Sequence, residues 1–181
     1  MGYGTHESKD TLLWLSYAKQ RFPNLQIFLL GVSMGAATVL MMSDQISPQD
    51  VKGIIADCAY TSAWDEFKYQ LKTSFHLPAF PILHICDLFC RLYAHYSFKD
   101  ASPVDHVKHA KVPVLFIHGK EDDFVPFYME KELYDACGSE KTLLAVDGAV
   151  HARSYHRNSA LYEKTLNLFF EKYSRVFSER K

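Results

Sequence analysis

The sequence has no excess of charge of either sign. Its 181 residues carry 20 Lys and Arg against 21 Asp and Glu, a formal net charge of −1. A protein that holds a nucleic-acid backbone needs a basic surface, so nucleic-acid binding is disfavoured. Apolar residues make up 48% and charged residues 23%. These values are ordinary for a globular chain that buries one sizeable core, and they argue against disordered or fibrous structure.

The chain also lacks long apolar runs. No stretch is long enough to cross a bilayer, and the N-terminal segment MGYGTHESKD does not resemble a signal peptide. Cysteines are few, at Cys58, Cys86, Cys90 and Cys137, and a core of this size does not need disulfides. We therefore expect reduced thiols, a cytoplasmic location and no membrane segment.

Two of the cysteines raise the question of a metal site. Cys86 and Cys90 are spaced to meet on one face of a helix, close to His84. Structural zinc sites combine two such pairs, and the sequence offers no second pair with metal spacing. We interpret these cysteines as small apolar residues of a helix, and we predict neither a metal nor a cofactor.

Short apolar runs alternate with helical patterns along the chain. Runs of strand length, typical of parallel strands buried on both faces, occur at residues 27–31, 53–57, 114–119 and 143–148. Helical spacing of apolar residues occurs at about 8–21, 35–43, 126–137 and 158–177, with Pro126 at a first helical position. This alternation predicts an α/β fold with a parallel sheet flanked by helices.

Residues 64–108 interrupt the alternation and are rich in aromatic side chains. Ile82, Ile85, Phe89 and Leu92 mark one helix within this segment. We interpret it as a helical, lid-like insertion within a single domain that covers residues 1–181. Most of its aromatic side chains are expected in the core.

Gly31, Ser33 and Gly35 form a G-x-S-x-G motif. The pattern recurs by chance, but here it follows a predicted buried strand and precedes a helix, which is the context the motif requires. The flanking glycines would let the chain turn sharply and expose the serine hydroxyl. The backbone N–H of Met34, at the helix N-terminus, could then donate to an oxyanion. The motif predicts Ser33 as a nucleophile, and the alternative is an ordinary turn serine.

A nucleophilic serine needs a base and an acid that orients the base. In this topology they follow in the order Ser, acid, His. Glu121, Asp122 and Asp123 follow the strand at 114–119, and His151 follows the run at 143–148. Both loops lie at the carboxyl ends of parallel strands, where ligands bind in open α/β sheets. The alternatives are a helix-capping aspartate and a surface histidine.

The segments GVSMGAATVL, DCAYTS, PVLFIHGKEDDFVP and GAVHARSY together resemble the α/β-hydrolase superfamily. They are most similar to bacterial serine hydrolases of its prolyl-oligopeptidase-like and carboxylesterase-like branch. The family pattern H-G-x-x-D-x-x-V-P falls on His118, Gly119, Asp122, Val125 and Pro126. The resemblance therefore implies Asp122 as the acid, with Asp123 in reserve and Asp57 at a rarer position. We expect His118 to brace the loop through a hydrogen bond rather than to react.

The resemblance implies acyl transfer to water. His151 would take the proton of Ser33, Ser33 would attack an ester or amide carbonyl, and Asp122 would hold the imidazole. The weakly charged, aromatic insertion suits a small apolar acyl group, and nothing in the sequence resembles a propeller that screens peptides. We therefore expect a small-molecule substrate and an esterase rather than a peptidase.

This sequence contains no counterpart of the first part of the family pattern. Relatives have strands ahead of the nucleophile strand, and a loop there supplies the second oxyanion donor. In this chain one helix occupies most of the residues before Ser33, and Tyr3-Gly4 is too close to that helix to serve. We interpret the chain as the C-terminal part of a larger enzyme with a partial α/β-hydrolase fold.

That interpretation leaves an alternative function open. Loss of one oxyanion donor lowers the rate about 100- to 1,000-fold. The chain could then be a weakly active or inactive fragment, which would act by pairing the open, apolar strand at residues 27–30 with a partner or with a second copy of itself.

Overall fold

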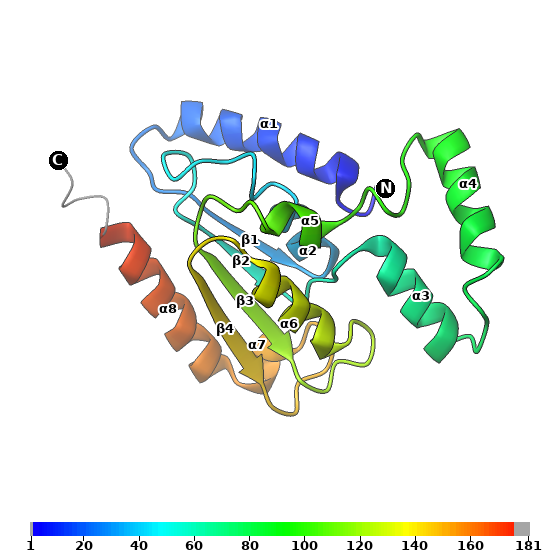
Figure 1. Ribbon diagram of the computed structural model, residues 1–181. Helices are drawn as coiled ribbons and strands as arrows, with labels where there is room; N and C mark the ends of the chain where they lie inside the picture. The colour runs from blue at the N-terminus through cyan, green and yellow to red at the C-terminus, as the bar shows by residue number, and fades with distance from the viewer. Residues whose placement is uncertain (1, 176–181) are drawn as a thin grey trace.

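The computed structural model describes residues 2–175 (Figure 1). Its strands are β1 (Phe28–Val32), β2 (Gly53–Asp57), β3 (Val114–Gly119) and β4 (Lys141–Val146). Its helices are α1 (Thr5–Arg21), α2 (Met34–Leu40), α3 (Ala63–Thr73), α4 (Ile82–Ala94), α5 (Pro103–Val107), α6 (Phe127–Ala136), α7 (Ser154–Arg157) and α8 (Ser159–Arg175).

The strands form one four-stranded parallel sheet in the order β1-β2-β3-β4. This confirms the predicted α/β fold, and β2 and β3 have the predicted bounds. Strand β4 begins earlier than predicted, at Lys141, because this edge strand is only partly buried and tolerates polar side chains at its start. Strand β1 likewise extends to Val32, which is exposed.

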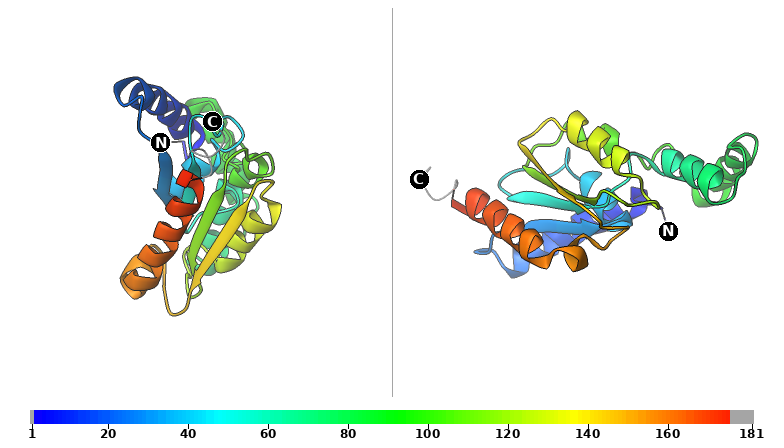
Figure 2. Two further views of the ribbon diagram at one scale, coloured as in Figure 1. Left: turned by 90° about the vertical axis from the view of Figure 1, so that its left-hand side faces the viewer. Right: turned by 90° about the horizontal axis from the view of Figure 1, so that it is seen from below.

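Alternate side chains of the sheet pack into two layers. Ile54 and Ala56 belong to a buried cluster that includes residues of α1, α2, α5 and α6, whereas Ile55 packs into a second cluster with Phe169 and Tyr173 of α8. The view from below shows α6 and α8 on opposite faces of the sheet (Figure 2). Because both faces of the sheet are covered, β2 and β3 are buried throughout, and their side chains are apolar except for Asp57 and His118.

Two predicted helices differ in detail. Helix α6 begins at Phe127, and Pro126 is its N-cap with an extended ψ of 140° rather than its first helical residue. Helix α1 begins at Thr5 and buries Leu15, but Leu13 and Tyr17, which share the apolar pattern, are exposed. Since α1 lies at the open side of the sheet, only one narrow stripe of it reaches the core.

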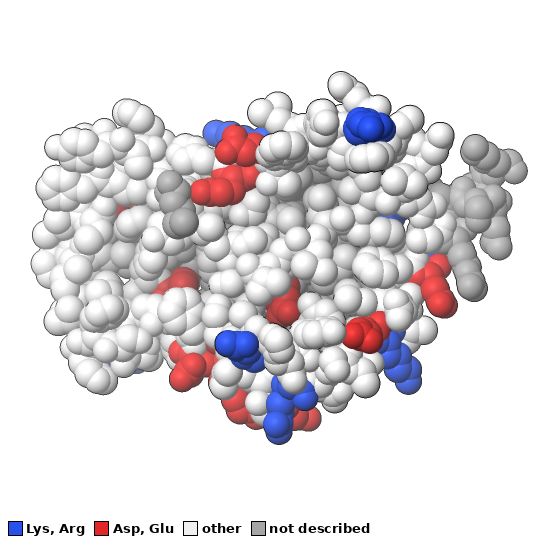
Figure 3. Space-filling view, turned by 180° about the vertical axis from the view of Figure 1, so that it is seen from behind, with Lys and Arg blue, Asp and Glu red and all other residues white. Residues whose placement is uncertain are grey.

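Helices α3 and α4 form a hairpin that extends away from the sheet (Figures 1 and 2). The expectation that its aromatic side chains lie in the core is wrong for Phe75, Phe80, Phe89 and Tyr93, which are exposed. Seen from behind, this end of the molecule carries few charged side chains (Figure 3). Within residues 2–175, no helix has both the length and the apolar character needed to cross a membrane.

Candidate active site

Ser33 stands in a strained turn between β1 and α2. Its φ of 54° and ψ of −117° are unusual for a residue with a side chain, and such conformations cost on the order of 1–3 kcal/mol. The Ser33 N–H donates to the Asp57 carbonyl oxygen at 2.8 Å and fastens the turn to β2. A Cβ on Gly31 would lie 2.1 Å from the Gly35 carbonyl oxygen, so this turn requires glycine there.

The second motif glycine has a different role from the one expected. A Cβ on Gly35 would meet no atom within 4 Å. The prediction that both flanking glycines relieve side-chain clashes is therefore correct for Gly31 and wrong for Gly35. The two glycines differ because a Cβ on Gly31 would point at the Gly35 backbone, whereas a Cβ on Gly35 would point into open space.

The structure brings Ser33, His151 and Asp122 together at the carboxyl end of the sheet. His151 Nε2 lies 2.9 Å from Ser33 Oγ, and His151 Nδ1 lies 2.8 Å from Asp122 Oδ2. With Nδ1–H donating to the carboxylate, Nε2 is free to accept the hydroxyl proton. The geometry is that of a nucleophile, a base and an orienting acid in one chain of hydrogen bonds.

Burial distinguishes Asp122 from its acidic neighbours. Asp122 is buried, whereas Glu121 and Asp123 are exposed. Its Oδ1 accepts hydrogen bonds from the N–H groups of Phe124 and Val125 at 3.0 and 2.9 Å. Asp122 thus accepts hydrogen bonds from N–H groups of its own loop instead of capping the following helix, while its Oδ2 faces His151.

A buried histidine supports the same carboxylate from the other side. His118 Nε2 donates to the Val125 carbonyl oxygen at 2.8 Å, the loop-bracing bond expected for it, and lies 3.2 Å from Asp122 Oδ2. Its Nδ1 is 3.4 Å from Oε2 of Glu130, which is fully buried on α6. A buried imidazole between two carboxylates favours its charged form.

These contacts shift the pKa values of all three groups. Burial alone would raise the pKa of Asp122, but its contacts with His118 and His151 lower it to about 2. Burial would lower the pKa of His118, but Asp122 and Glu130 raise it to about 10. Burial raises the pKa of Glu130 to about 7 despite its contact with His118. Near neutral pH the triad acid is therefore an anion beside a cation.

Asp57, the last residue of β2, and Cys58, which follows it, lie next to the triad. Asp57 Oδ2 accepts from the Tyr162 hydroxyl at 3.0 Å, and burial raises the pKa of this carboxyl. Burial and the nearby Asp57 also raise the pKa of the Cys58 thiol. His151 Nδ1 is bonded to Asp122, and the Asp57 carboxylate is bonded to Tyr162, so Asp57, the rarer position for the acid, does not occupy that role in this arrangement.

Potential metal ligands gather at the same place. Ligand atoms of Cys58, Asp122 and His151 lie within 4.8 Å of one another, and they are the one such group among residues 2–175. Asp122 and His151 already satisfy each other, and Cys58 is held as the neutral thiol, whereas a metal binds the thiolate. The arrangement fits a hydrogen-bonded triad better than a metal centre.

A small pocket of about 130 Å³ opens beside Ser33. Met34, the first residue of α2, lines it, and its backbone N–H has no partner within the helix. The remaining wall comes from the loop after β2, from α3, from the loop after β3 and from the N-terminal turn: Tyr3, Tyr60, Ala63, Glu66, Phe67, Gln70, Phe124 and Val125.

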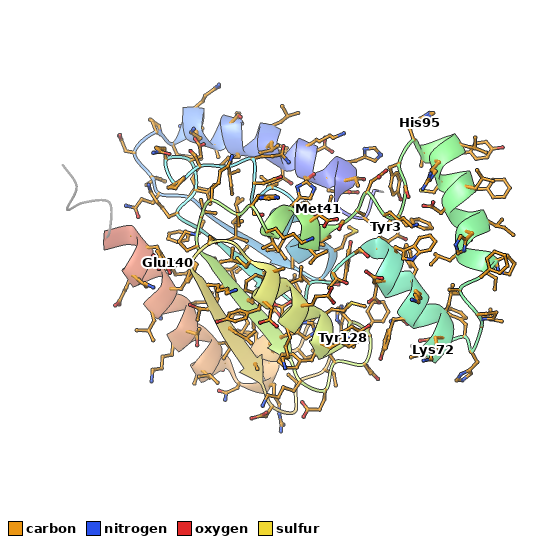
Figure 4. The ribbon with its side chains drawn as sticks, viewed as in Figure 1. Tyr3, Met41, Lys72, His95, Tyr128 and Glu140 are labelled. Carbon is orange, nitrogen blue, oxygen red and sulfur yellow. The ribbon has the colours of Figure 1, made fainter. Side chains whose placement is uncertain are left out.

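Tyr3 and Glu66 are two of the wall residues that sequence reasoning did not predict for the site. The N-terminal turn, with φ of 49° at Tyr3 and 102° at Gly4, brings Tyr3 to the pocket wall between α1 and the α3–α4 hairpin (Figure 4). There its carbonyl oxygen accepts from the Tyr60 hydroxyl at 2.9 Å. Glu66 lies in the first turn of α3, where an acid ordinarily complements the helix dipole, so no signal in the sequence marked it.

The chain matches known proteins over most of its length. A family model described as the prolyl oligopeptidase family matches residues 1–176. An uncharacterized protein of Bacillus subtilis, YqkD, is 31% identical over 170 residues, which cover 93% of this chain and 56% of YqkD. The lysophosphatidylserine lipase ABHD12 of Danio rerio is 27% identical over 142 residues, covering 75% of this chain and 35% of that protein.

Among solved structures, the Pyrococcus furiosus esterase Pf2001 superimposes with a TM-score of 0.71 at 17% identity, over 96% of this chain and 64% of that one. At this identity the likeness concerns the fold. The chain spans only 56% and 35% of the lengths of the two curated relatives.

Proposed function

The chain belongs to the prolyl oligopeptidase family of α/β hydrolases, and from that premise we propose that it is a serine hydrolase that cleaves esters by forming an acyl-enzyme on Ser33. One observation carries the proposal: His151 bridges Ser33 Oγ at 2.9 Å and Asp122 Oδ2 at 2.8 Å. Separate loops supply these three side chains, so a packing requirement does not explain why they converge.

In the acylation step, Ser33 Oγ attacks the substrate carbonyl carbon while its proton passes to His151 Nε2. The carbonyl oxygen becomes an oxyanion, to which the Met34 N–H donates. Asp122 stabilises the imidazolium through Nδ1–H. When the carbon–oxygen bond to the leaving group breaks, His151 returns the proton to the departing alcohol.

Deacylation repeats the sequence with water. His151 Nε2 takes a proton from the water, whose oxygen attacks the acyl carbon of the ester on Ser33. The bond to Ser33 Oγ then breaks, the proton returns to the serine, and the free acid leaves. No cofactor enters either step.

Leaving-group chemistry favours an ester over an amide at this site, because an alcohol leaves more readily than an amine. The pocket is also small and mostly apolar in lining, as suits a short acyl group. Among the curated relatives matched, one is named a lipase.

The experiment is labelling of the purified chain with a fluorophosphonate probe, followed by hydrolysis of esters and anilides of matched acyl groups. We expect labelling that Ser33→Ala abolishes and that Ser16→Ala, at an exposed serine of α1, leaves intact. Esters should be cleaved faster than anilides. A folded chain that does not label would overturn the proposal.

A second function is supported by the exposed edge of β1. Leu30 and Val32 are 51% and 42% exposed there, and among residues 2–175 the strand pairs with β2 alone. An apolar edge of this kind favours pairing with another strand. In this alternative the chain is a weakly active or inactive module that acts by assembly.

A further inference from the structure

The pocket beside Ser33 contains an acidic side chain to which the ester-cleaving mechanism assigns no function. Glu66 is 6% exposed, yet it lines the pocket with Ser33 and Met34. Its Oε1 accepts a hydrogen bond from Gln70 Nε2 at 3.0 Å, whereas its buried Oε2 has no hydrogen-bond partner. Buried acids are ordinarily paired, so the free oxygen calls for a partner from outside the chain.

Neighbouring contacts fix this carboxyl group in position. Gln70 Nε2 also donates to the Phe124 carbonyl oxygen at 2.5 Å, and Gln70 Oε1 accepts from Ser74. The Phe124 ring in turn lies 4.9 Å from the His151 ring. Glu66 is thus linked through Gln70 to the loop that covers the catalytic histidine, and its orientation is coupled to the reacting centre.

The pocket corresponds to the acyl side of the substrate. A leaving group must lie beside His151 Nε2, which protonates it, and His151 is not among the residues that line this pocket. The group that fills the pocket is therefore attached to the acyl carbon. Its volume of about 130 Å³ compares with about 30 Å³ for one water, which leaves room for an acyl group of a few heavy atoms.

We propose that Glu66 binds a protonated amine carried by this short acyl group, so that the preferred substrates are esters of small amino acids. The inference rests on the proposed ester-cleaving function and names its substrate class. Charge supports it, since Glu66 is the one acidic residue among the described residues that line the pocket, and none of them is Lys or Arg. A carboxylate on the acyl group would be repelled.

The free oxygen of Glu66 suits an ammonium better than a neutral group. Burial raises the pKa of Glu66 to about 7, so the empty pocket binds a proton readily. An ammonium would replace that proton with a charge-assisted hydrogen bond, which is about twice as strong as a neutral one. A purely apolar acyl chain would leave the buried oxygen unpaired.

The test is ligand binding to the Ser33→Ala protein, which requires no turnover. Calorimetry would compare L-alanine benzyl ester, L-lactate benzyl ester and propionate benzyl ester, which differ only in an ammonium, a hydroxyl or a hydrogen. We expect the alanine ester to bind about 10- to 100-fold more tightly than the propionate ester. Adding Glu66→Gln should remove that preference, whereas adding Glu132→Gln, at an exposed acid of α6, should preserve it.

Several results would overturn the inference. They are equal binding of the alanine and propionate esters, a preference that survives Glu66→Gln, and a lactate ester that binds as tightly as the alanine ester. The first and last comparisons need no Glu66 variant, so they decide the matter even if Glu66→Gln fails to fold. Hydrolysis of the propionate ester by the wild-type chain, which retains Ser33, is measured separately. If the wild-type chain does not hydrolyse this ester, the result counts against the ester-cleaving function and not against amine binding.

Discussion

At the scale of single residues, the site is a row of titratable side chains that runs inward from Ser33. His151, Asp122, His118 and Glu130 follow one another at 2.8, 3.2 and 3.4 Å. The last two side chains are fully buried, where charges are tolerated only in pairs. This row holds the triad acid as an anion in a place that would otherwise favour its neutral form.

The carboxylate of Asp122 can be tested against its exposed neighbour. Asp122→Asn keeps the shape of the side chain but removes the charge that fixes the imidazole tautomer, and we expect kcat for a short-chain ester to fall by about 10,000-fold. Asp123→Asn should change kcat less than about twofold, since Asp123 is exposed. If the two substitutions lowered kcat equally, Asp122 would not be the acid that orients His151.

His118 makes the free energy of unfolding depend on pH in the neutral to alkaline range. Its pKa is raised to about 10 in the folded chain, against about 6.5 in the unfolded chain. Its contribution is therefore complete below about pH 6.5 and is lost as the pH rises through about 10. We expect the free energy of unfolding to fall by about 2–4 kcal/mol across this range.

Urea unfolding between pH 6 and pH 10 measures this dependence. His118→Gln should lower stability by about 3–5 kcal/mol at neutral pH, because it leaves buried carboxylates without their cation, and its stability should then change less with pH. His109→Gln, at an exposed histidine, is the matched control. If the wild-type curve and the His118→Gln curve are parallel, His118 is not the group that titrates.

Tyr3 and Glu66 show where prediction from residues ends. Motif spacing predicts Ser33 and His151 as site residues, because each follows a recognisable strand. Nothing local distinguishes Glu66 from an exposed helix-terminal acid, since its burial comes from the packing of α3 against the loop after β3. Tyr3 reaches the pocket through a left-handed turn that its own sequence does not require.

At the scale of elements, the predictable parts are those buried on both sides. Strands β2 and β3 were predicted to the residue because every side chain in them is apolar or directed at the site. The exposure of the apolar face of α4 is not predictable from the sequence. Ile85, Phe89 and Leu92 have helical spacing, yet they are exposed, since apolar spacing predicts a helix without identifying what covers its face.

The turn between β1 and α2 offers a matched pair of glycine substitutions. Gly31→Ala places a Cβ 2.1 Å from the Gly35 carbonyl oxygen, so the turn must open. We expect a loss of about 1–3 kcal/mol of stability, together with loss of fluorophosphonate labelling. Gly35→Ala meets no atom within 4 Å and lies in helix α2, where alanine is favoured by about 1 kcal/mol.

Thermal unfolding and labelling rate, measured on both variants, check this expectation. Gly35→Ala should unfold at or above the wild-type temperature. If Gly31→Ala were as stable and as reactive as Gly35→Ala, the close backbone approach at Gly31 would not be a requirement of the turn.

At the scale of the whole molecule, the sheet has two different edges. Strand β4 ends one side, where most of its positions are exposed or half-buried and two, Lys141 and Thr142, are polar. Strand β1 ends the other with the exposed apolar residues Leu30 and Val32. Every residue of β2 and β3 is buried. The fold can therefore form around these two strands while the β1 edge remains available for pairing.

We therefore expect the 181-residue chain to self-associate through β1. Sedimentation velocity over a range of micromolar concentrations should show mass rising with concentration. Leu30→Lys should shift the population to monomer, because a charge on an edge strand opposes strand addition. Leu168→Lys is the matched control, since Leu168 is 58% exposed but lies on α8. A wild-type chain that stays monomeric, or a Leu168→Lys variant that dissociates equally, would show that the β1 edge does not drive assembly, and the case for an assembly module would lose its one supporting observation.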